Sequence, residues 1–303
     1  MPRAFLASLT AFLLLLPPGL HAQERETLGF GRLFSNDYLG DGKDRWRTGS
    51  YVVSKVTGFG WNGARPALMG DIIEYRFRSD IMAPDNIVTA DPGDRRYAGA
   101  LSFGVHTYFS RGNTEISLGS DLVITGEQTG IGSFQREIHK LLGASRPGVL
   151  GNQIPNGFYP GATVELGRPF QISPNVNLRP FVELQAGAET LVRVGGDLQI
   201  GKLGLDELML RDVTTGQRYR ANRGAGSGFA FVFGADIARV ESSIFLPGYD
   251  GYVLTDSRQR LRAGVHWQGE KSALFYGLTW LSEEFTAQPE AQVLGSLRLD
   301  IRF

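Results

Sequence analysis

The sequence contains no cysteine, no surplus of charge of either sign and no long hydrophobic run in its main part. Because cysteine is absent, a disulfide scaffold, thiol catalysis, a zinc ribbon and an iron–sulfur cluster are excluded. Lys and Arg number 31, as do Asp and Glu, so the formal net charge is zero, which argues against a nucleic-acid-binding protein. Beyond the N-terminal segment no run reaches the roughly 18 apolar residues that a membrane-spanning helix needs.

Glycine and phenylalanine, in contrast, are frequent. Glycine accounts for 40 of the 303 residues and phenylalanine for 19, and the glycine share is about twice the typical value of roughly 7%. The apolar fraction of 42% is sufficient for an ordered fold. Because helix-forming runs are also scarce, this composition predicts a protein built of strands and turns.

The N-terminus has the features of a secretory signal peptide. Arg3 supplies a positive charge, Ala4–Leu16 form an apolar run, and a Pro-Pro-Gly sequence at 17–19 ends it before the small residue Ala22. The run is too short to span a bilayer, which disfavours the alternative of an uncleaved anchor. We therefore predict a signal peptide over residues 1–22 and a mature chain, a single outer-membrane β-barrel domain, over residues 23–303.

The C-terminus alternates between apolar and polar residues, as a strand with two different faces does. One face carries Leu297, Leu299, Ile301 and Phe303, and the other carries Arg298, Asp300 and Arg302. A terminal aromatic residue on such a strand is typical of bacterial outer-membrane barrels. A soluble antiparallel sandwich also alternates and remains the alternative. The signal peptide, the glycine excess and the terminal Phe together favour a transmembrane antiparallel β-barrel, the sheet form that spans lipid without an unpaired edge.

The alternation predicts an all-β fold of about twelve strands in one domain, with both termini on the periplasmic side. The expected strands are 26–34, 47–60, 70–80, 98–110, 114–126, 161–169, 177–187, 190–200, 228–240, 256–268, 272–283 and 292–303. The outward loops are then 35–46, 81–97, 127–160, 241–255 and 284–291. Residues 201–227 are long for a periplasmic turn, so the count could differ by one hairpin.

The third outward loop contains a short helix. Ser133 is the expected N-cap and Gly143 the expected end. Gln135 and His139 are four residues apart and so project from one face. The expected apolar side, which should pack against the protein, consists of Ile138, Leu141 and Leu142. An amide and an imidazole presented together favour a functional site, although a histidine that merely hydrogen-bonds is the simpler interpretation. The other two histidines of the mature chain, His106 and His266, fall within strands, where a wall or lumen role suffices.

Five short motifs occur in order through the first half of the mature chain. They are Asn36-Asp37, Arg47-Thr48-Gly49, Gly93-Asp94-Arg95, Gln135-x-x-x-His139 and Pro147-x-x-Leu150-x-x-Gln153. In order and approximate spacing this set resembles the lipid A 3′-O-deacylases of the LpxR type.

The resemblance implies an outer-membrane enzyme that hydrolyses the 3′-linked acyloxyacyl ester of lipid A with Ca²⁺. It implies that His139 is the base and that Gln135, Asn36, Asp37 and Thr48 surround it. The expected partners are the lipid A of outer-leaflet lipopolysaccharide and membrane lipids, with no nucleic acid, and we expect a monomer.

Two positions depart from the family pattern. Family members carry a lysine in the second outward loop, whereas residues 81–92 contain neither Lys nor Arg. The role of that lysine is therefore vacant or passes to Arg95 or Arg96. A tryptophan often stands where this chain has Leu150.

The residues themselves are suited to ester hydrolysis. A neutral imidazole accepts a proton from water near neutral pH, which gives His139 the role of general base. Asp37 would hold Ca²⁺ as a Lewis acid, because carboxylate, carbonyl and hydroxyl oxygens are hard ligands. Asp37 and Thr48 should be neighbours, since they lie at the facing ends of adjacent antiparallel strands. The amides of Asn36 and Gln135 and the Thr48 hydroxyl would orient water, base or substrate.

Basic residues of the outward segments are candidate partners for lipid A phosphates, although such residues are usually just solvated. These candidates are Arg45, Arg47, Arg136 and Lys140.

Two other functions remain open at this stage. A passive barrel, either a small pore or a scaffold, would need no chemistry at His139. An outer-membrane phospholipase would use a serine nucleophile beside a histidine, and Ser133 and Ser35 are the candidates.

Overall fold

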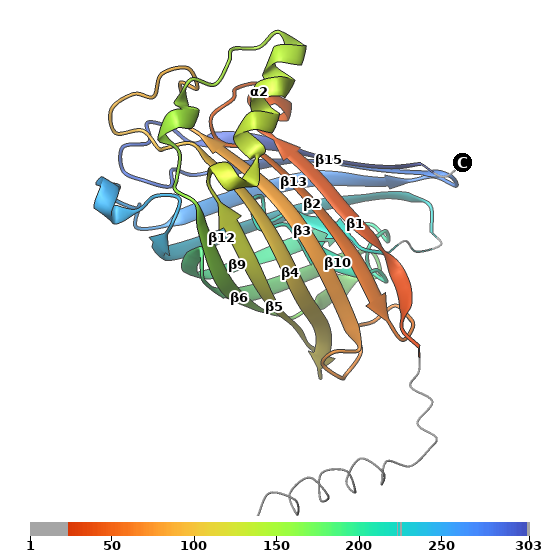
Figure 1. Cartoon of the computed structure of the whole chain (residues 1–303). Helices are drawn as coiled ribbons and strands as arrows, with labels where there is room; N and C mark the ends of the chain where they lie inside the picture. Colours follow the sequence, from red (N-terminus) through yellow and green to blue (C-terminus); the bar gives the residue numbers. More distant parts are fainter. Residues whose placement is uncertain (1–23, 223, 225, 302–303) are drawn as a thin grey trace, which may run out of the picture.

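The computed structural model describes residues 24–222, 224 and 226–301, and within them nearly all regular structure is extended (Figure 1). The predicted signal peptide and the terminal Phe303 lie outside the described residues. The strands are β1 (Glu26–Asn36), β2 (Trp46–Gly58), β3 (Ile72–Ala83), β4 (Ala98–Arg111), β5 (Thr114–Thr125), β6 (Gly157–Gly167), β7 (Phe170–Ser173), β8 (Val176–Ala186), β9 (Glu189–Ile200), β10 (Met209–Arg211), β11 (Arg218–Arg220), β12 (Gly228–Ser243), β13 (Arg258–Gln268), β14 (Ser272–Leu281) and β15 (Gln292–Ile301). The helices are α2 (Ile131–Leu142) and the short 3₁₀ turns η1 (Asp37–Leu39), η2 (Glu127–Thr129), η3 (Val149–Asn152) and η4 (Gly248–Asp250).

The long strands close into an antiparallel ring. In the described part of the chain the sheet order is β6-β5-β4-β3-β2-β1-β15-β14-β13-β12-β9-β8, and pairing of β6 with β8 closes it. The four-residue β7 pairs only with β8 and stands beside the ring. The prediction of a twelve-stranded barrel is therefore confirmed. No helix among the described residues is long and apolar enough to cross a membrane.

The two faces of the ring have opposite chemistry. Phe30, Phe231 and Leu299 on the outer face are 56%, 50% and 52% exposed, whereas Glu74 and Asp236 on the inner face are buried. A soluble sandwich would place its apolar face inside, so the inverted pattern decides against that alternative. Apolar residues outside and polar residues inside are what a lipid-embedded barrel requires.

The long connection between β9 and β12 is not a periplasmic turn. In its described part it folds into the barrel lumen as the hairpin β10–β11 (Figure 1). The Tyr219 hydroxyl lies 2.9 Å from the Ser54 hydroxyl of β2, and the Thr214 hydroxyl donates to Asp80 of β3 at 3.1 Å. An apolar cluster joins the hairpin to the wall; its members are Leu33, Val52, Val56, Ile72, Tyr108, Leu208, Leu210, Tyr219, Ala221 and Phe275. The extra hairpin therefore fills the barrel instead of enlarging it.

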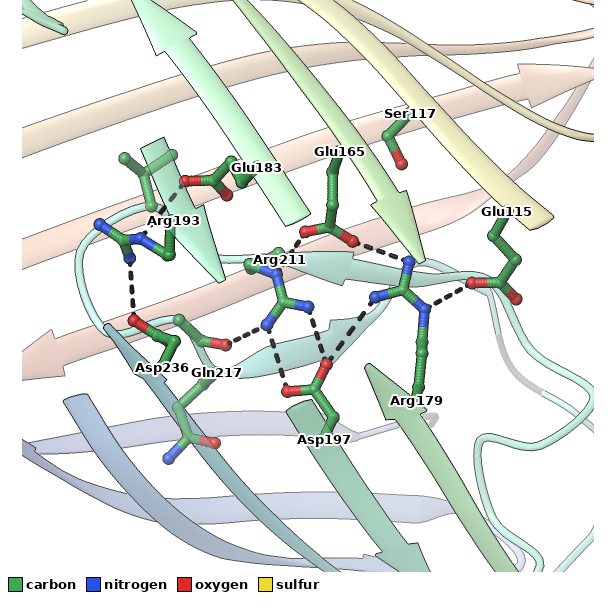
Figure 2. A network of polar contacts seen from close by, with 12 residues as sticks. Glu115, Ser117, Glu165, Arg179, Glu183, Arg193, Asp197, Arg211, Gln217 and Asp236 are labelled. Carbon is green, nitrogen blue, oxygen red and sulfur yellow. Dashed lines mark hydrogen bonds and ion pairs between the residues drawn. The ribbon is translucent and has the colours of Figure 1, made fainter. Parts of the chain in front are cut away.

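Ion pairs fix the hairpin to the charged inner wall (Figure 2). Arg211 of β10 bonds Asp197 at 2.7 Å and Glu165 at 2.5 Å. Arg179 of the wall bonds Glu165 and Glu115, both at 2.7 Å. Removing one partner from such a buried pair typically costs about 3–5 kcal/mol, because the other charge is left desolvated and unpaired. These pairs therefore hold the hairpin in the lumen.

The filled lumen leads to a prediction about conductance. Reconstituted in a planar lipid bilayer, the intact protein should give no stable ion conductance, because hairpin side chains occupy the lumen. Replacing residues 206–222 by a short Gly-Ser turn should open a steady conductance and lower the temperature of the heat-modifiable gel shift. Stable conductance by the intact, folded protein would contradict the lumenal position of the hairpin.

Candidate functional site

An irregularity in β2 sets the direction of the side chains at its outward end. The β2–β3 register shifts between Trp46 and Gly49, and among the described residues Trp46 is the one residue other than glycine with positive φ, at 50°. Arg47 lines an interior cavity together with Val213 of the lumenal hairpin. Since successive side chains of a strand point to opposite faces, Thr48 is turned to the outer side of the wall.

The turn η1, which follows β1, contacts Thr48 on the outer side of the wall. The side-chain oxygen Oδ1 of Asn36 accepts from the Tyr38 backbone amide at 2.9 Å, and its side-chain nitrogen Nδ2 donates to the Thr48 backbone carbonyl at 2.7 Å. One Asp37 oxygen accepts from the Arg45 amide at 2.7 Å, and the other accepts from the Thr48 hydroxyl at 3.1 Å. The predicted contact between Asp37 and Thr48 is therefore present. Asn36 acts as a clamp, because both ends of its amide are used to hold η1 against β2.

A second carboxylate, not predicted as part of the site, completes this cluster. Asp44 lies within hydrogen-bond distance of the Thr48 hydroxyl and 3.3 Å from Nε2 of His139. The Thr48 hydroxyl has a single hydrogen, yet it faces Asp37 and Asp44 together. Asp44 stands only four residues before Thr48 in an outward loop, and that position was the available signal for it.

Helix α2 reaches the cluster because it is fixed to the outer wall of the barrel. Ile131 packs against Gly99 of β4, where an added Cβ would lie 2.7 Å from the Ile131 Cβ. The helix begins after Gly130, without a side-chain cap, and ends as predicted at Gly143, whose φ is 69°. The prediction of Ser133 as N-cap was wrong, since the helix begins two residues earlier and Ser133 lies in its first turn.

The hydrogen bonds of His139 define its tautomer. Nδ1 lies 2.6 Å from the carbonyl oxygen of Ser145. Because a carbonyl only accepts, Nδ1 carries a proton, and Nε2 of the neutral ring is the basic nitrogen. Nε2 faces the Gln135 side-chain nitrogen at 3.4 Å and Asp44 at 3.3 Å. His139 therefore directs its basic nitrogen at the carboxylate cluster.

Gln135 orients the imidazole from the preceding turn of α2. The Gln135 side chain is buried, and its carbonyl oxygen has no hydrogen-bond partner. The spacing of four residues placed both side chains on one face, as the sequence predicted. All five predicted site residues, Asn36, Asp37, Thr48, Gln135 and His139, thus lie in one contiguous region.

The electrostatics of this region are those of an uncompensated negative cluster. Burial, and secondarily repulsion from Asp44, raise the pKa of Asp37 to about 8, against the lowering effect of its hydrogen bonds. In the described part of the chain no Lys or Arg side chain contacts Asp37 or Asp44. No group of three or more His, Asp or Glu side chains that could hold a metal occurs among those residues. A cation here would thus rely on two carboxylates, a hydroxyl and neutral oxygens.

Two of the four candidate phosphate-binding residues are already paired. Arg45 lies over the Trp46 ring at 4.0 Å and forms ion pairs with carboxylates that include Glu290. Arg47 bonds Glu284 at 2.7 Å on the inner side. These two predictions were wrong, since the register shift turns one inward and neighbouring carboxylates hold the other. Arg136 and Lys140 of α2 remain exposed.

Neither candidate for the family's loop lysine reaches the site. Arg95 is completely buried and bonds Glu284 at 2.6 Å, and Arg96 bonds Asp250 at 2.9 Å. Leu150, at the position of the family's tryptophan, is buried and packs toward Gly132 of α2.

The other two histidines of the described chain, His106 and His266, lie away from this cluster and contact side chains of the barrel wall. His106 lies 3.1 Å from Asp121, and His266 stacks on Phe275 with ring centroids 4.4 Å apart. Both are buried side chains of strands.

The chain is similar to known outer-membrane proteins. The family described as outer membrane protein LpxR matches residues 6–303. The structure of LpxR from Salmonella typhimurium superposes with a TM-score of 0.76 at 17% sequence identity, covering 91% of this chain and 100% of that one.

The beta domain of the Bordetella autotransporter BrkA gives a TM-score of 0.43 at 12% identity and covers 91% of this chain and 99% of that one. No curated protein sequence matches the chain. Because the family model spans nearly the whole sequence and the closed barrel agrees with it, this chain belongs to the LpxR family of outer membrane proteins.

Proposed function

We propose that this protein hydrolyses the 3′-linked acyloxyacyl ester of lipid A, with His139 as general base and Ca²⁺ as cofactor. Membership of the LpxR family and the barrel fold support an outer-membrane lipid A deacylase. The observation that carries the finer proposal is the position of the His139 Nε2, 3.3 Å from Asp44 in the cluster with Thr48 and Asp37. This cluster lies at the outward end of β2, and lipid A occupies the outer leaflet.

The donor set fits a weakly held Ca²⁺. Asp37 and Asp44 face one hydroxyl without a Lys or Arg side chain between them. With both carboxylates ionised, the cluster would have a negative charge that a cation would compensate. Asp37, Asp44 and Thr48 would hold the ion, with water and main-chain oxygens completing the shell, because Ca²⁺ takes 6–8 oxygen ligands. When bound, it would supply a Lewis acid for the ester carbonyl. Because only two of the ligands would be carboxylates, we expect the affinity of the site for Ca²⁺ to be modest.

The residues of the chain account for the movement of the proton. His139 Nε2 takes a proton from water as the water oxygen attacks the ester carbonyl carbon. The imidazolium is stabilised by Asp44 on one side and the Ser145 carbonyl on the other. When the carbonyl–oxygen bond to the sugar breaks, Nε2 returns the proton to the leaving alkoxide. The products are a carboxylic acid and a lipid A with a free hydroxyl at the 3′ position.

Neither alternative function is favoured by a specific contact. A pore needs an open lumen, but the β10–β11 hairpin occupies it. A serine esterase needs a serine beside a histidine. The Ser35 hydroxyl bonds that of Ser296 at 2.8 Å and is buried, and Ser133 is exposed, with no hydrogen bond to a histidine.

The first prediction from the site concerns the base. His139→Ala should lower the rate of deacylation of purified lipid A in detergent by about 10²- to 10⁴-fold, the usual contribution of a general base. Glu137→Gln, an exposed change on the other side of α2, should keep full activity, and both variants should show the heat-modifiable migration of a folded barrel. A folded His139→Ala protein with full activity would exclude the base assignment.

The second prediction concerns the metal. Activity should disappear when a chelator is added and return with Ca²⁺, whereas Asp37→Ala should stay inactive at high Ca²⁺ because a ligand is missing. Asp91→Asn, which neutralises an exposed carboxylate of another outward loop, should respond to Ca²⁺ like the wild type. Turnover by thoroughly washed, chelated enzyme would contradict the Ca²⁺ requirement.

The third prediction follows from the raised pKa of Asp37, about 8. The ion needs the charged carboxylate, so below that pH a proton must leave before Ca²⁺ binds. The Ca²⁺ concentration for half-maximal activity should therefore rise about tenfold for each pH unit below about 8, and should level off above it. A half-maximal concentration that is constant between pH 6 and 9, measured at saturating lipid A, would contradict a single competing proton of this pKa.

A further inference from the structure

Helix α2 presents an apolar stripe that no part of the described chain covers. Phe134, Leu141 and Leu142 are 60%, 80% and 75% exposed, and Ile138 between them is only partly buried. The spacing of four, three and one residues places all four side chains along one side of the helix. The sequence predicted that this side would pack against the protein, but the structure packs only its first residue, Ile131, together with the neighbouring side, which carries Gln135.

The helix is attached to the lipid-facing side of the wall. Ile131 lies against Gly99 of β4. Gly99 shares the outer face of that strand with Phe103 and Val105, which are both 51% exposed, because residues two apart in a strand point the same way. Figure 1 shows α2 at the outward ends of the front strands. The apolar stripe therefore continues the lipid-facing band of the barrel at its outer margin.

The charge beside the stripe suits an anionic lipid surface. Arg136, Lys140 and Arg146 are exposed on or just after α2. Glu137, the acidic residue of the helix, is 3.8 Å from Lys140 in a pair with both side chains largely exposed, which is worth little. An apolar side next to a basic side is the pattern of helices that lie at the boundary between headgroups and acyl chains.

We propose that the apolar stripe of α2 inserts among the acyl chains at the outer margin of the outer leaflet and anchors the helix there. Phe134, Leu141 and Leu142 would contact acyl carbons, and Arg136 and Lys140 would lie at the level of the lipid phosphates. The anchored helix carries His139 on its adjacent side and so holds the base at the depth of the lipid's ester groups. The anchoring itself does not depend on hydrolysis, whereas its catalytic consequence rests on the proposed function.

The absence of cysteine allows a direct test of depth. Phe134→Cys and Leu141→Cys, each labelled with an environment-sensitive dye, are reconstituted in phosphatidylethanolamine–phosphatidylglycerol vesicles with or without brominated acyl chains. The matched controls are Arg136→Cys and Lys140→Cys, whose exposed positions lie on the side of the helix opposite the stripe. Each labelled barrel is first checked for heat-modifiable migration.

Insertion predicts blue-shifted emission at positions 134 and 141 and at least twofold stronger bromolipid quenching there than at 136 and 140. Equal, water-like emission at all four positions would overturn the proposal. Blue-shifted emission without bromolipid quenching would also overturn it, because the stripe would then be covered by protein. Disulfide cross-linking of unlabelled Leu141→Cys molecules would identify a second copy of the chain as that cover.

A kinetic measurement tests the catalytic consequence. Leu141→Asp should raise the half-saturating lipid A concentration in vesicles about tenfold and leave kcat within about twofold, because the change removes one apolar anchor and puts a charge among the acyl chains. Glu137→Gln should change neither constant. Equal KM values for Leu141→Asp and wild type would overturn the catalytic consequence, because anchoring by α2 would then not affect access of lipid A to the site. If the wild type does not deacylate lipid A, the proposed function fails while the dye measurement still decides the anchoring.

Discussion

The structure depends on closure of the strand ring in lipid. Pairing of β6 with β8 leaves no open edge, so the backbone groups of the wall are satisfied without water. The outer face is then apolar by necessity, and the charged side chains are turned inward, where Arg179 and Arg211 find carboxylate partners. The lumenal hairpin supplies part of that pairing. As a result the described residues leave no open channel at the centre of the ring, and the cluster around His139 lies at the outward rim.

The candidate site at the outward rim depends on one backbone irregularity, the register shift in β2. The register shift at Trp46 places the neighbours Arg47 and Thr48 on opposite sides of the wall, so Arg47 pairs inside while Thr48 meets Asp37 outside. Helix α2 brings His139 to the same place because Gly99 lets it approach the wall. A carboxylate cluster without a Lys or Arg partner and an imidazole whose Nε2 carries no proton thus face each other where the barrel meets the outer leaflet.

The sequence was informative wherever a repeating pattern reflects a physical period. Alternation at period two predicted the twelve strands, and the four-residue spacing in α2 paired Gln135 with His139. The lumenal hairpin was not predicted, because its contacts with Ser54 and Asp80 join residues far apart in the chain. Asp44 was missed because its position four residues before Thr48 in an outward loop does not by itself indicate contact with His139. The inward turn of Arg47 depends on a register shift that strand parity alone does not predict.

The most direct test of the account is the mass of lipid A from cells that express the wild-type chain in their outer membrane. Cells with the protein should yield lipid A lighter by one 3′-linked acyloxyacyl group, with phospholipids unchanged. Lipid A of unaltered mass, from cells in which the folded barrel is present and Ca²⁺ is supplied, would contradict the account.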